Sequence, residues 1–252
     1  MKLRILGCSG ADFSGCKTSS YLIDRSLLVD AGTITSVLSV EEQSEIRQVL
    51  ITHSHLDHIK GLPSLADSRC FDQASGGITV AGISETVSAL REHLFNGILW
   101  PDFSRLPTRE KPAISFMSVE AEVEYEFGDY VVTPFRVNHT VPAVGFLVRS
   151  RGVALLFSGD TGPTDRLWEF APMANALIVE VSFPNDMEQL ARDSCHLTSR
   201  MLATELGKAR HLPPRILVTH SKPQFHTIIQ DELRAVGVVG IELLSDGDLF
   251  EF

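Results

Sequence analysis

The most informative stretch of the sequence is Thr52-His53-Ser54-His55-Leu56-Asp57-His58, which directly follows the apolar run Val49-Leu50-Ile51. Side chains alternate along an extended chain, so His53 and His55 point to the same side. Asp57 and His58 then turn away and face a second position. Imidazole and carboxylate groups without a thiolate suit zinc, and manganese or iron also accept such ligands. This stretch therefore predicts a site for two metal ions at the end of a buried strand.

Three other apolar runs also end at a side chain that can bind a metal, and these are His139, Asp160 and His220. Ligand sites in α/β folds lie at the carboxyl ends of strands, so we expect all of these side chains to meet. One ion would take His53, His55 and His139. The other would take Asp57, His58 and His220, and Asp160 would bridge the two. A lone histidine such as His211 is more often structural.

The overall composition excludes several classes of protein. The 252 residues include 22 Lys and Arg against 32 Asp and Glu, a net charge of −10, which argues against a protein that grips long DNA or RNA. No apolar run reaches the roughly 20 residues of a membrane helix, and the first residues do not resemble a secretory signal. The four cysteines are scattered, as is typical of reduced thiols. We expect a soluble, cytoplasmic protein with no membrane partner.

Strand-like and helix-like segments are interspersed along the whole chain, without a linker or an internal repeat. We therefore expect one domain, residues 1–252, of the α/β class, with two sheets in the middle and helices outside. The apolar patterns predict strands at 3–6, 20–23, 27–29, 48–52, 113–117, 122–127, 130–137, 143–149, 153–157, 176–181 and 215–219. They predict helices over 83–94, 197–209 and 227–236.

The histidine pattern resembles the metallo-β-lactamase superfamily of dinuclear metallohydrolases, and the resemblance covers nearly the whole chain. It implies a four-layer αββα sandwich with two divalent metal ions at the edge of the sheets, and zinc is the first candidate for these ions. Val29-Asp30-Ala31-Gly32 is similar to the family's second-strand motif, whose aspartate supports the ligands. Asp30 can accept an N–H group from a ligating imidazole. The alternative is that Asp30 is only a turn residue before Gly32.

Two further stretches resemble the phosphodiesterase branch of this superfamily. The first combines Leu6-Gly7-Cys8-Ser9-Gly10 with Thr18-Ser19-Ser20-Tyr21-Leu22. Backbone amides in such a glycine-rich loop would line a phosphate site, with Ser9, Gly10 and Ser19 as candidate substrate contacts. A simple strand-to-strand turn is the equal alternative.

The second stretch pairs Glu180 with His196, and resembles a pair found in transfer-RNA 3′-processing endonucleases and in class II cyclic-nucleotide phosphodiesterases. A histidine that does not bind metal can protonate the leaving oxygen of a phosphate ester. Glu180 would orient His196 and keep it charged. We therefore name His196, Glu180 and the proton-handling Asp57 as the candidate catalytic residues. The alternative for His196 is a structural histidine.

Three segments, 53–64, 93–101 and 157–168, closely resemble the class II 3′,5′-cyclic-nucleotide phosphodiesterases, although Pro63 departs from the pattern. Within the second segment Trp100 is a candidate for stacking on a base, with core packing as the alternative. The transfer-RNA endonucleases insert a basic arm between the positions of His139 and Asp160, and this interval has no room for one. The resemblance implies a dinuclear-metal phosphodiesterase that converts cAMP, cGMP or both to 5′-nucleotides.

Other functions remain open at this point. Another hydrolase of the same fold would keep the metals and change the pocket: a nuclease for short oligonucleotides, an RNase Z-like phosphodiesterase or a thioesterase. A non-enzymatic alternative is a cyclic-nucleotide-binding protein with a silent site. The expected partner is a small cyclic nucleotide rather than a long nucleic acid, and relatives commonly form homodimers.

Overall fold

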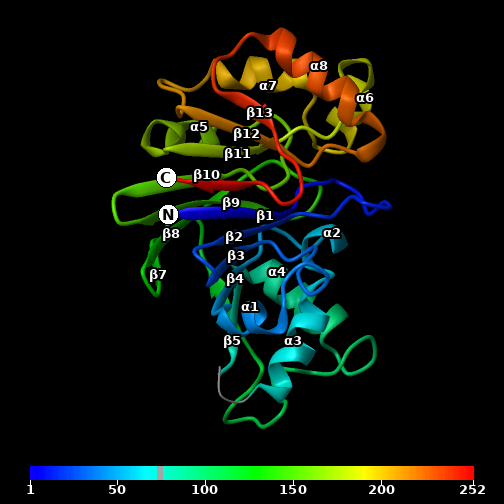
Figure 1. Cartoon of the computed structure of the whole chain (residues 1–252), viewed down its shortest axis with the longest axis vertical. Helices are drawn as coiled ribbons and strands as arrows, with labels where there is room; N and C mark the ends of the chain where they lie inside the picture. Colours follow the sequence, from blue (N-terminus) through cyan, green and yellow to red (C-terminus); the bar gives the residue numbers. More distant parts are fainter. Residues whose placement is uncertain (73–75) are drawn as a thin grey trace.

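The computed structural model describes residues 1–72 and 76–252, and in these ranges the chain forms two seven-stranded β-sheets. The sheets lie face to face, with one group of helices outside each of them (Figure 1). This is the expected α/β fold with the αββα order of layers.

The first sheet has the strand order β14-β1-β2-β3-β4-β5-β6. Its strands from β14 to β3 are antiparallel neighbours, and those from β3 to β6 are parallel. Their bounds are β1 Lys2–Gly7, β2 Ser20–Ile23, β3 Leu27–Val29, β4 Gln48–Leu50, β5 Ile78–Ile83, β6 Ile114–Val119 and β14 Leu249–Glu251.

The second sheet repeats this plan, in the order β13-β12-β11-β10-β9-β8-β7. The strands from β13 to β10 are parallel, and those from β10 to β7 are antiparallel. Because β8 and β10 both run antiparallel to β9, they end at the same edge of the sheet as β11 and β12. The bounds are β7 Tyr125–Phe127, β8 Tyr130–Arg136, β9 Val144–Ser150, β10 Val153–Phe157, β11 Ala176–Glu180, β12 Arg215–Thr219 and β13 Ile241–Leu243.

Capping groups mark some of the helix ends. The hydroxyl of Ser39 and the carboxylate of Glu42 form a capping box at the start of α1, and Gly237, in the left-handed region, ends α8. The helices of the first half are α1 Val40–Glu45, α2 Leu56–Ile59, α3 Leu62–Phe71, α4 Ser84–Ala89 and the π-helix η1 Leu90–Leu94. Those of the second half are α5 Arg166–Phe170, η2 Ala171–Met173, η3 Asn185–Met187, α6 Glu188–Asp193, α7 Ser199–Leu206, η4 Pro223–Phe225 and α8 His226–Val236.

Three apolar layers hold this arrangement together. In β10, Leu155 and Phe157 face the layer between the sheets, whereas Leu156 faces the layer under the helices of the second half. A third layer lies between the first sheet and its own helices. Strands covered on both faces need continuous apolar runs, which is why these segments were readable as strands in the sequence.

Several predicted boundaries are wrong. Strand β5 was not predicted, and Ile83, placed at the start of a helix, is instead the last residue of β5. The predicted strand 48–52 ends at Leu50, and the helix predicted over 197–209 covers only Ser199–Leu206. Short elements such as α2, with four residues, are too brief for a periodic pattern to develop.

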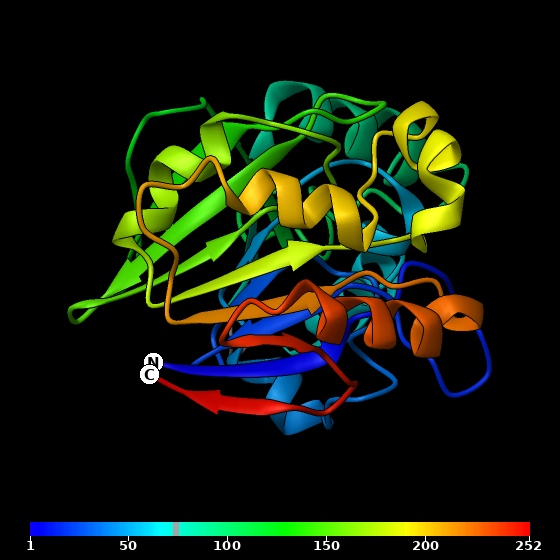
Figure 2. The ribbon, with the colours of Figure 1, turned by 90° about the horizontal axis from the view of Figure 1, so that it is seen from above.

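The two ends of the chain lie side by side, as Figure 2 shows. The amino group of Met1 donates to the carbonyl of Phe252 at 2.9 Å, and the amide of Phe252 donates back to Met1 at 2.9 Å. In the described ranges no helix has the length and apolar character needed to cross a membrane.

Candidate metal centre

Strand ends from both sheets bring the predicted ligands to one edge of the molecule. His53 follows β4, His139 follows β8, Asp160 follows β10 and His220 follows β12. The sheets are joined at this edge by a hydrogen bond of 3.0 Å from the amide of Val144 to the carbonyl of Thr52.

A glycine allows the close approach of the sheets at this edge. Gly159 has a positive φ of 61°, and a Cβ atom there would lie 3.0 Å from the side chain of Thr52. The turn into Asp160 therefore needs glycine for both its backbone conformation and its lack of a side chain.

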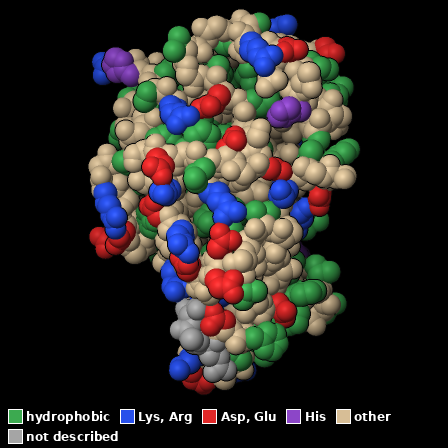
Figure 3. All heavy atoms as spheres, in the orientation of Figure 1, with side chains coloured by type: hydrophobic (Ala, Val, Ile, Leu, Met, Phe, Trp, Pro, Cys, Tyr) green, Lys and Arg blue, Asp and Glu red, His purple; other side chains and the backbone are tan. Residues whose placement is uncertain are grey.

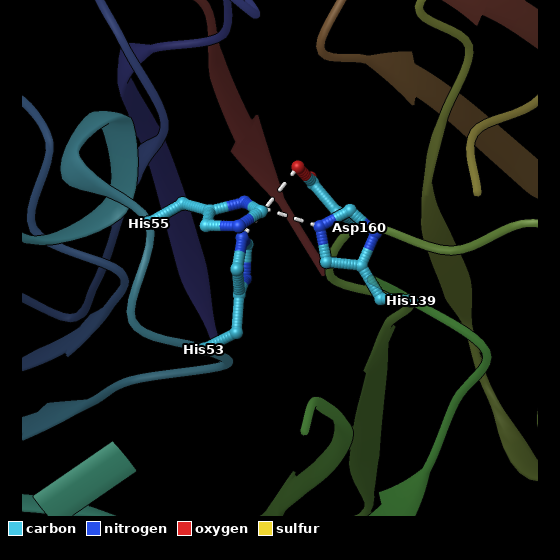
Figure 4. Close-up of side chains that lie close together, drawn as sticks. All are labelled: His53, His55, His139 and Asp160. Carbon is cyan, nitrogen blue, oxygen red and sulfur yellow. Dashed lines mark hydrogen bonds and ion pairs between the residues drawn. The ribbon is translucent and has the colours of Figure 1, made fainter. Parts of the chain in front are cut away.

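The first group of side chains contains the three histidines predicted to bind one ion and the aspartate predicted to bridge the two ions. Ligand atoms of His53, His55, His139 and Asp160 all lie within 4.8 Å of one another, and Figure 4 shows the four side chains converging. Nε2 of His139 is 3.2 Å from Nδ1 of His55, and Nε2 of His53 is 3.7 Å from Oδ2 of Asp160. As the alternation of an extended chain predicts, His53 and His55 share one side, with ring centroids 4.7 Å apart.

The second group contains Asp57, His58, Asp160 and His220, again with ligand atoms within 4.8 Å. Nε2 of His220 lies 3.2 Å from Oδ2 of Asp57 and 3.2 Å from Oδ2 of Asp160. Nε2 of His58 lies 3.3 Å from Oδ1 of Asp160. Asp160 thus belongs to both groups, in the position expected of a bridging carboxylate.

The electrostatics of the first group suit a bound cation. Burial lowers the pKa of His53 well below its usual range, and burial also lowers the pKa of His55 and of His139. These rings are therefore neutral at physiological pH and present lone pairs. Buried Nε2 of His53 has no hydrogen-bond partner among the described residues. Imidazole and carboxylate donors in this arrangement fit divalent metal ions.

Asp30 supports the second group from behind. Its buried Oδ2 accepts a hydrogen bond from Nδ1 of His58 at 2.8 Å, and its Oδ1 accepts one from the amide of Thr52 at 2.9 Å. Asp30 thereby fixes the orientation of the ring, so that Nε2 of His58 faces Asp160. Asp30 also has a left-handed φ of 58°, so it is both a turn residue and a supporting residue.

Asp57 and His58 carry opposite charges in the absence of metal. Burial opposes ionisation of Asp57, but its hydrogen bond with His220 and the nearby His58 outweigh burial and lower its pKa. Burial likewise opposes protonation of His58, yet the carboxylates of Asp160 and Asp30 raise its pKa well above the usual range. A metal ion at this position would displace the proton on Nε2 of His58.

Glu180 and His196 form a buried ion pair beside both groups. Nδ1 of His196 lies 2.6 Å from Oε1 of Glu180. Burial lowers the pKa of His196, but the charge of Glu180 and its hydrogen bond outweigh burial and raise that pKa to about 9. The ring of His196 stacks on His220 with centroids 5.4 Å apart and lies 5.2 Å from the ring of His139. The pair can therefore present a proton next to the metal groups.

The backbone amides of the glycine-rich loop are engaged within the protein. The amide of Ser9 donates to the carbonyl of Lys17 at 2.8 Å, and the amide of Gly10 donates to Ser221 at 3.2 Å. Neither amide is free to bind a phosphate. Gly10 instead allows close packing on His220, because a Cβ atom at Gly10 would lie 2.8 Å from that ring.

The other two candidate substrate contacts, Ser19 and Trp100, lie in different environments. Ser19 is completely buried, which excludes direct contact with a substrate in this conformation. Trp100 is 38% exposed in the loop after η1, so it is not a core residue. In the part of the chain that the structure describes, its ring makes no ring contact with the histidines of the site.

Sequence reasoning missed two residues of the site, Ser182 and Lys222. The hydroxyl of Ser182 lies between Glu180 and His220, at 3.0 and 2.8 Å. The ammonium group of Lys222 donates to the carbonyl of Gly10 at 2.8 Å. Each stands two positions after a predicted residue, Glu180 or His220, and period-two alternation was the signal that could have found both.

Comparison with known proteins agrees with this geometry. A family model described as "Beta-lactamase superfamily domain" matches residues 25–221. Ribonuclease Z of Bacillus subtilis is 23% identical, over 77% of this chain and 76% of its own length. A probable 3′,5′-cyclic-nucleotide phosphodiesterase of Yersinia pestis is 27% identical, over 83% of this chain and 69% of its own length.

Solved structures share the fold at lower identity. Unliganded yeast PDE1 superposes with a TM-score of 0.82 at 19% identity, covering 98% of both chains. The short form of human tRNase Z superposes with a TM-score of 0.70 at 20% identity, covering 100% of this chain and 99% of its own. Because the family model spans most of the sequence and its fold recurs here, the chain belongs to the metallo-β-lactamase superfamily of metal-dependent hydrolases.

Proposed function

We propose that this protein is a dinuclear-metal phosphodiesterase that hydrolyses 3′,5′-cyclic nucleotides to 5′-nucleotides, with zinc as the first candidate metal. The observation that carries the proposal is the Glu180–His196 pair, whose Nδ1–Oε1 distance is 2.6 Å. It holds a protonated imidazole beside two groups of metal-binding side chains.

The raised pKa of His196 suits a poor leaving group. Hydrolysis of a sugar phosphate diester expels an alkoxide, which needs a proton as it leaves. A thioester instead expels a thiolate, whose conjugate acid has a pKa of about 8.5, so it needs an acid much less. His196, with a pKa of about 9, therefore supports the phosphodiesterase over the thioesterase.

The residues of the chain have distinct roles in this mechanism. Bound metal ions would supply positive charge and an activated water. Glu180 holds Nδ1 of His196, so the opposite nitrogen, Nε2, is the atom that would give its proton to the departing 3′-oxygen. Asp57, an ionised carboxylate 3.2 Å from His220, is placed to accept a proton from the attacking water.

The charge of the protein supports a small anionic substrate. The chain carries a net charge of −10. Figure 3 shows basic and acidic side chains interspersed over one face, without a continuous basic patch. Between His139 and Asp160 the chain forms only β9, β10 and a turn through Arg151 and Gly152. This interval, all of which the structure describes, contains no basic extension for gripping a folded RNA.

An RNase Z-like phosphodiesterase is the second candidate, because ribonuclease Z of Bacillus subtilis is as similar in sequence as the cyclic-nucleotide phosphodiesterases. The Glu180–His196 pair would serve equally well to protonate the 3′-oxygen released from an RNA chain. The two candidates differ in substrate size rather than in chemistry.

Product analysis separates the candidates. Protein loaded with zinc or manganese is incubated with 3′,5′-cAMP, 3′,5′-cGMP, a transfer-RNA precursor, a short oligonucleotide and a thioester, and the products are resolved by chromatography. We expect 5′-AMP, 5′-GMP or both. Cleavage of the precursor with intact cyclic nucleotides would establish the second candidate instead. Binding of cyclic nucleotide by the metal-loaded protein without turnover would indicate a silent site.

We further propose that residues 1–252 act as one domain. The reciprocal hydrogen bonds between Met1 and Phe252, both 2.9 Å, support this organisation because they close the first sheet with strand β14 from the far end of the chain. A homodimer remains a proposal that sedimentation would test.

A further inference from the structure

Ser182 occupies the junction between the metal groups and the Glu180–His196 pair. It lies just after β11 and is completely buried. Its Oγ is 2.8 Å from Nδ1 of His220, 3.0 Å from Oε2 of Glu180 and 3.2 Å from Nδ1 of His196. A hydroxyl has one proton and two lone pairs, so it cannot donate to all of these atoms.

The partners themselves determine the direction of each hydrogen bond. Oε2 of Glu180, at 3.0 Å, and the carbonyl of His220, at 3.3 Å, can only accept, and the shorter distance and the negative charge assign the proton of Ser182 to Glu180. The proton on Nδ1 of His196 is directed to the other carboxylate oxygen, Oε1, at the shorter distance of 2.6 Å. The oxygen of Ser182 is then free to accept the N–H of His220 at 2.8 Å.

This assignment commits a proton to Nδ1 of His220 and makes Nε2 the nitrogen available to a metal ion. Nε2 is the nitrogen that faces the second group, 3.2 Å from Asp57 and 3.2 Å from Asp160. A ligating imidazole needs this tautomer, and the partner of its other nitrogen fixes both the tautomer and the ring orientation.

Two other rings of the site have partners of a different kind. Nδ1 of His139 lies 3.1 Å from the carbonyl of Cys195, and Nδ1 of His58 lies 2.8 Å from the carboxylate of Asp30. The hydrogen bond of His220 differs, because its acceptor, Ser182, donates in turn to the carboxylate that holds His196.

We propose that Ser182 is a positioning residue that orients His220 for metal binding and links this ligand to the Glu180–His196 pair. Filling of the second metal group is thereby coupled to the orientation of the proton donor. The inference rests on the proposed metal site and acid, but it does not depend on which phosphodiester is cleaved.

A matched set of variants tests the proposal. Ser182→Ala removes the hydroxyl, whereas Ser182→Thr keeps it. Ser182→Val has the shape of threonine without the hydroxyl and provides a second comparison if the alanine variant does not fold. Ser199→Ala is the control, because Ser199 is also completely buried but its hydroxyl has no hydrogen-bond partner among the described residues.

The first measurement is metal affinity, from zinc titration against a chromophoric chelator with metal content checked by mass spectrometry. We expect Ser182→Ala and Ser182→Val to bind one of the two ions about 10- to 100-fold more weakly and the other normally. Ser182→Thr and Ser199→Ala should keep both affinities. Wild-type affinity for both ions in Ser182→Ala and Ser182→Val would overturn the proposal.

The second measurement follows the coupling directly by NMR of the histidine side chains. In the wild type, filling the weaker site should shift the ring resonances of His196, and Ser182→Thr should preserve this response. The response should be lost in Ser182→Ala even at saturating zinc, and an unchanged response there would refute the link. Failure of the wild type to hydrolyse any cyclic nucleotide would refute the proposed function but leave both measurements interpretable.

Discussion

Replacement of Glu180 by glutamine tests the proposed acid most directly. In Glu180→Gln, the introduced amide keeps the size of the side chain and an oxygen that can accept the Nδ1 proton of His196. The substitution removes the negative charge, which together with its hydrogen bond overcomes burial and raises the pKa of His196 from 6.5 to about 9. Burial remains in the variant, so the pKa of His196 should fall to 6.5 or below.

The size of the effect follows from the two pKa values. At pH 7.5 a pKa of about 9 leaves about 97% of His196 protonated, whereas a pKa of about 6.5 leaves about 9%. We therefore expect at least a roughly tenfold loss of kcat/KM at pH 7.5. At pH 6 a pKa of about 6.5 would leave about 76% of the variant protonated, so the loss should be smaller at pH 6 than at pH 7.5.

The assay is the pH dependence of kcat/KM for cyclic-nucleotide hydrolysis in metal-saturated protein. The alkaline limb of the profile reports loss of the proton from His196, and it should move down by at least about 2.5 pH units in the variant. Bound dications lower the pKa of His196 in both proteins, so the difference between the profiles is the quantity to compare. An alkaline limb that stays in place while both ions remain bound would refute the acid role.

Glu205→Gln is the matched control. Glu205 is another buried carboxylate, on α7, and it accepts a hydrogen bond from the indole of Trp168 at 2.9 Å. Its replacement should change stability without moving the pH profile.

The same shift has a consequence for stability with a definite sign. The folded state binds the proton of His196 more tightly than the unfolded state does. The resulting contribution to the free energy of unfolding is fully present below pH 6.5 and is lost as pH rises through about 9. For metal-free protein the shift corresponds to roughly 3 kcal/mol. Urea unfolding at several pH values should show this dependence in the wild type and not in Glu180→Gln.

Three further predictions concern the rest of the site. His196→Ala should slow hydrolysis of a cyclic nucleotide by about 10²- to 10⁴-fold. It should slow hydrolysis of bis-p-nitrophenyl phosphate far less, because nitrophenolate leaves without a proton. Equal losses on both substrates would contradict the acid role. Asp30→Ala leaves buried N–H groups of His58 and Thr52 without their acceptor, and should lower the free energy of unfolding by about 3–5 kcal/mol, measured in urea. Removal of metal by a chelator should lower the melting temperature, and added zinc should restore it; an unchanged melting temperature would argue against a metal site.

Local patterns in the sequence carried much of the fold and of the candidate site. The hairpin of β2 and β3, strand β10 and strand β12 have the predicted bounds, because each is a short apolar run closed by polar or turn residues. Shorter or less regular elements were not predictable in this way. Strand β5 merges into α4 without a polar break, so its last residue, Ile83, was read as the start of a helix and the rest of the strand was missed.

The sequence alone indicated which residues are candidates for binding metal and on which side of the chain they lie. The spacing of His53, His55, Asp57 and His58 after a strand carries this information, because strand periodicity is a local property. The packing of the folded chain was needed to show which groups share a proton or a hydrogen bond. Ser182 is hydrogen-bonded to His220, which lies 38 residues away in the sequence. The amide of Gly10 donates to the carbonyl of Ser221, at the other end of the chain. Such contacts depend on how the two sheets pack together, and no local pattern encodes that packing.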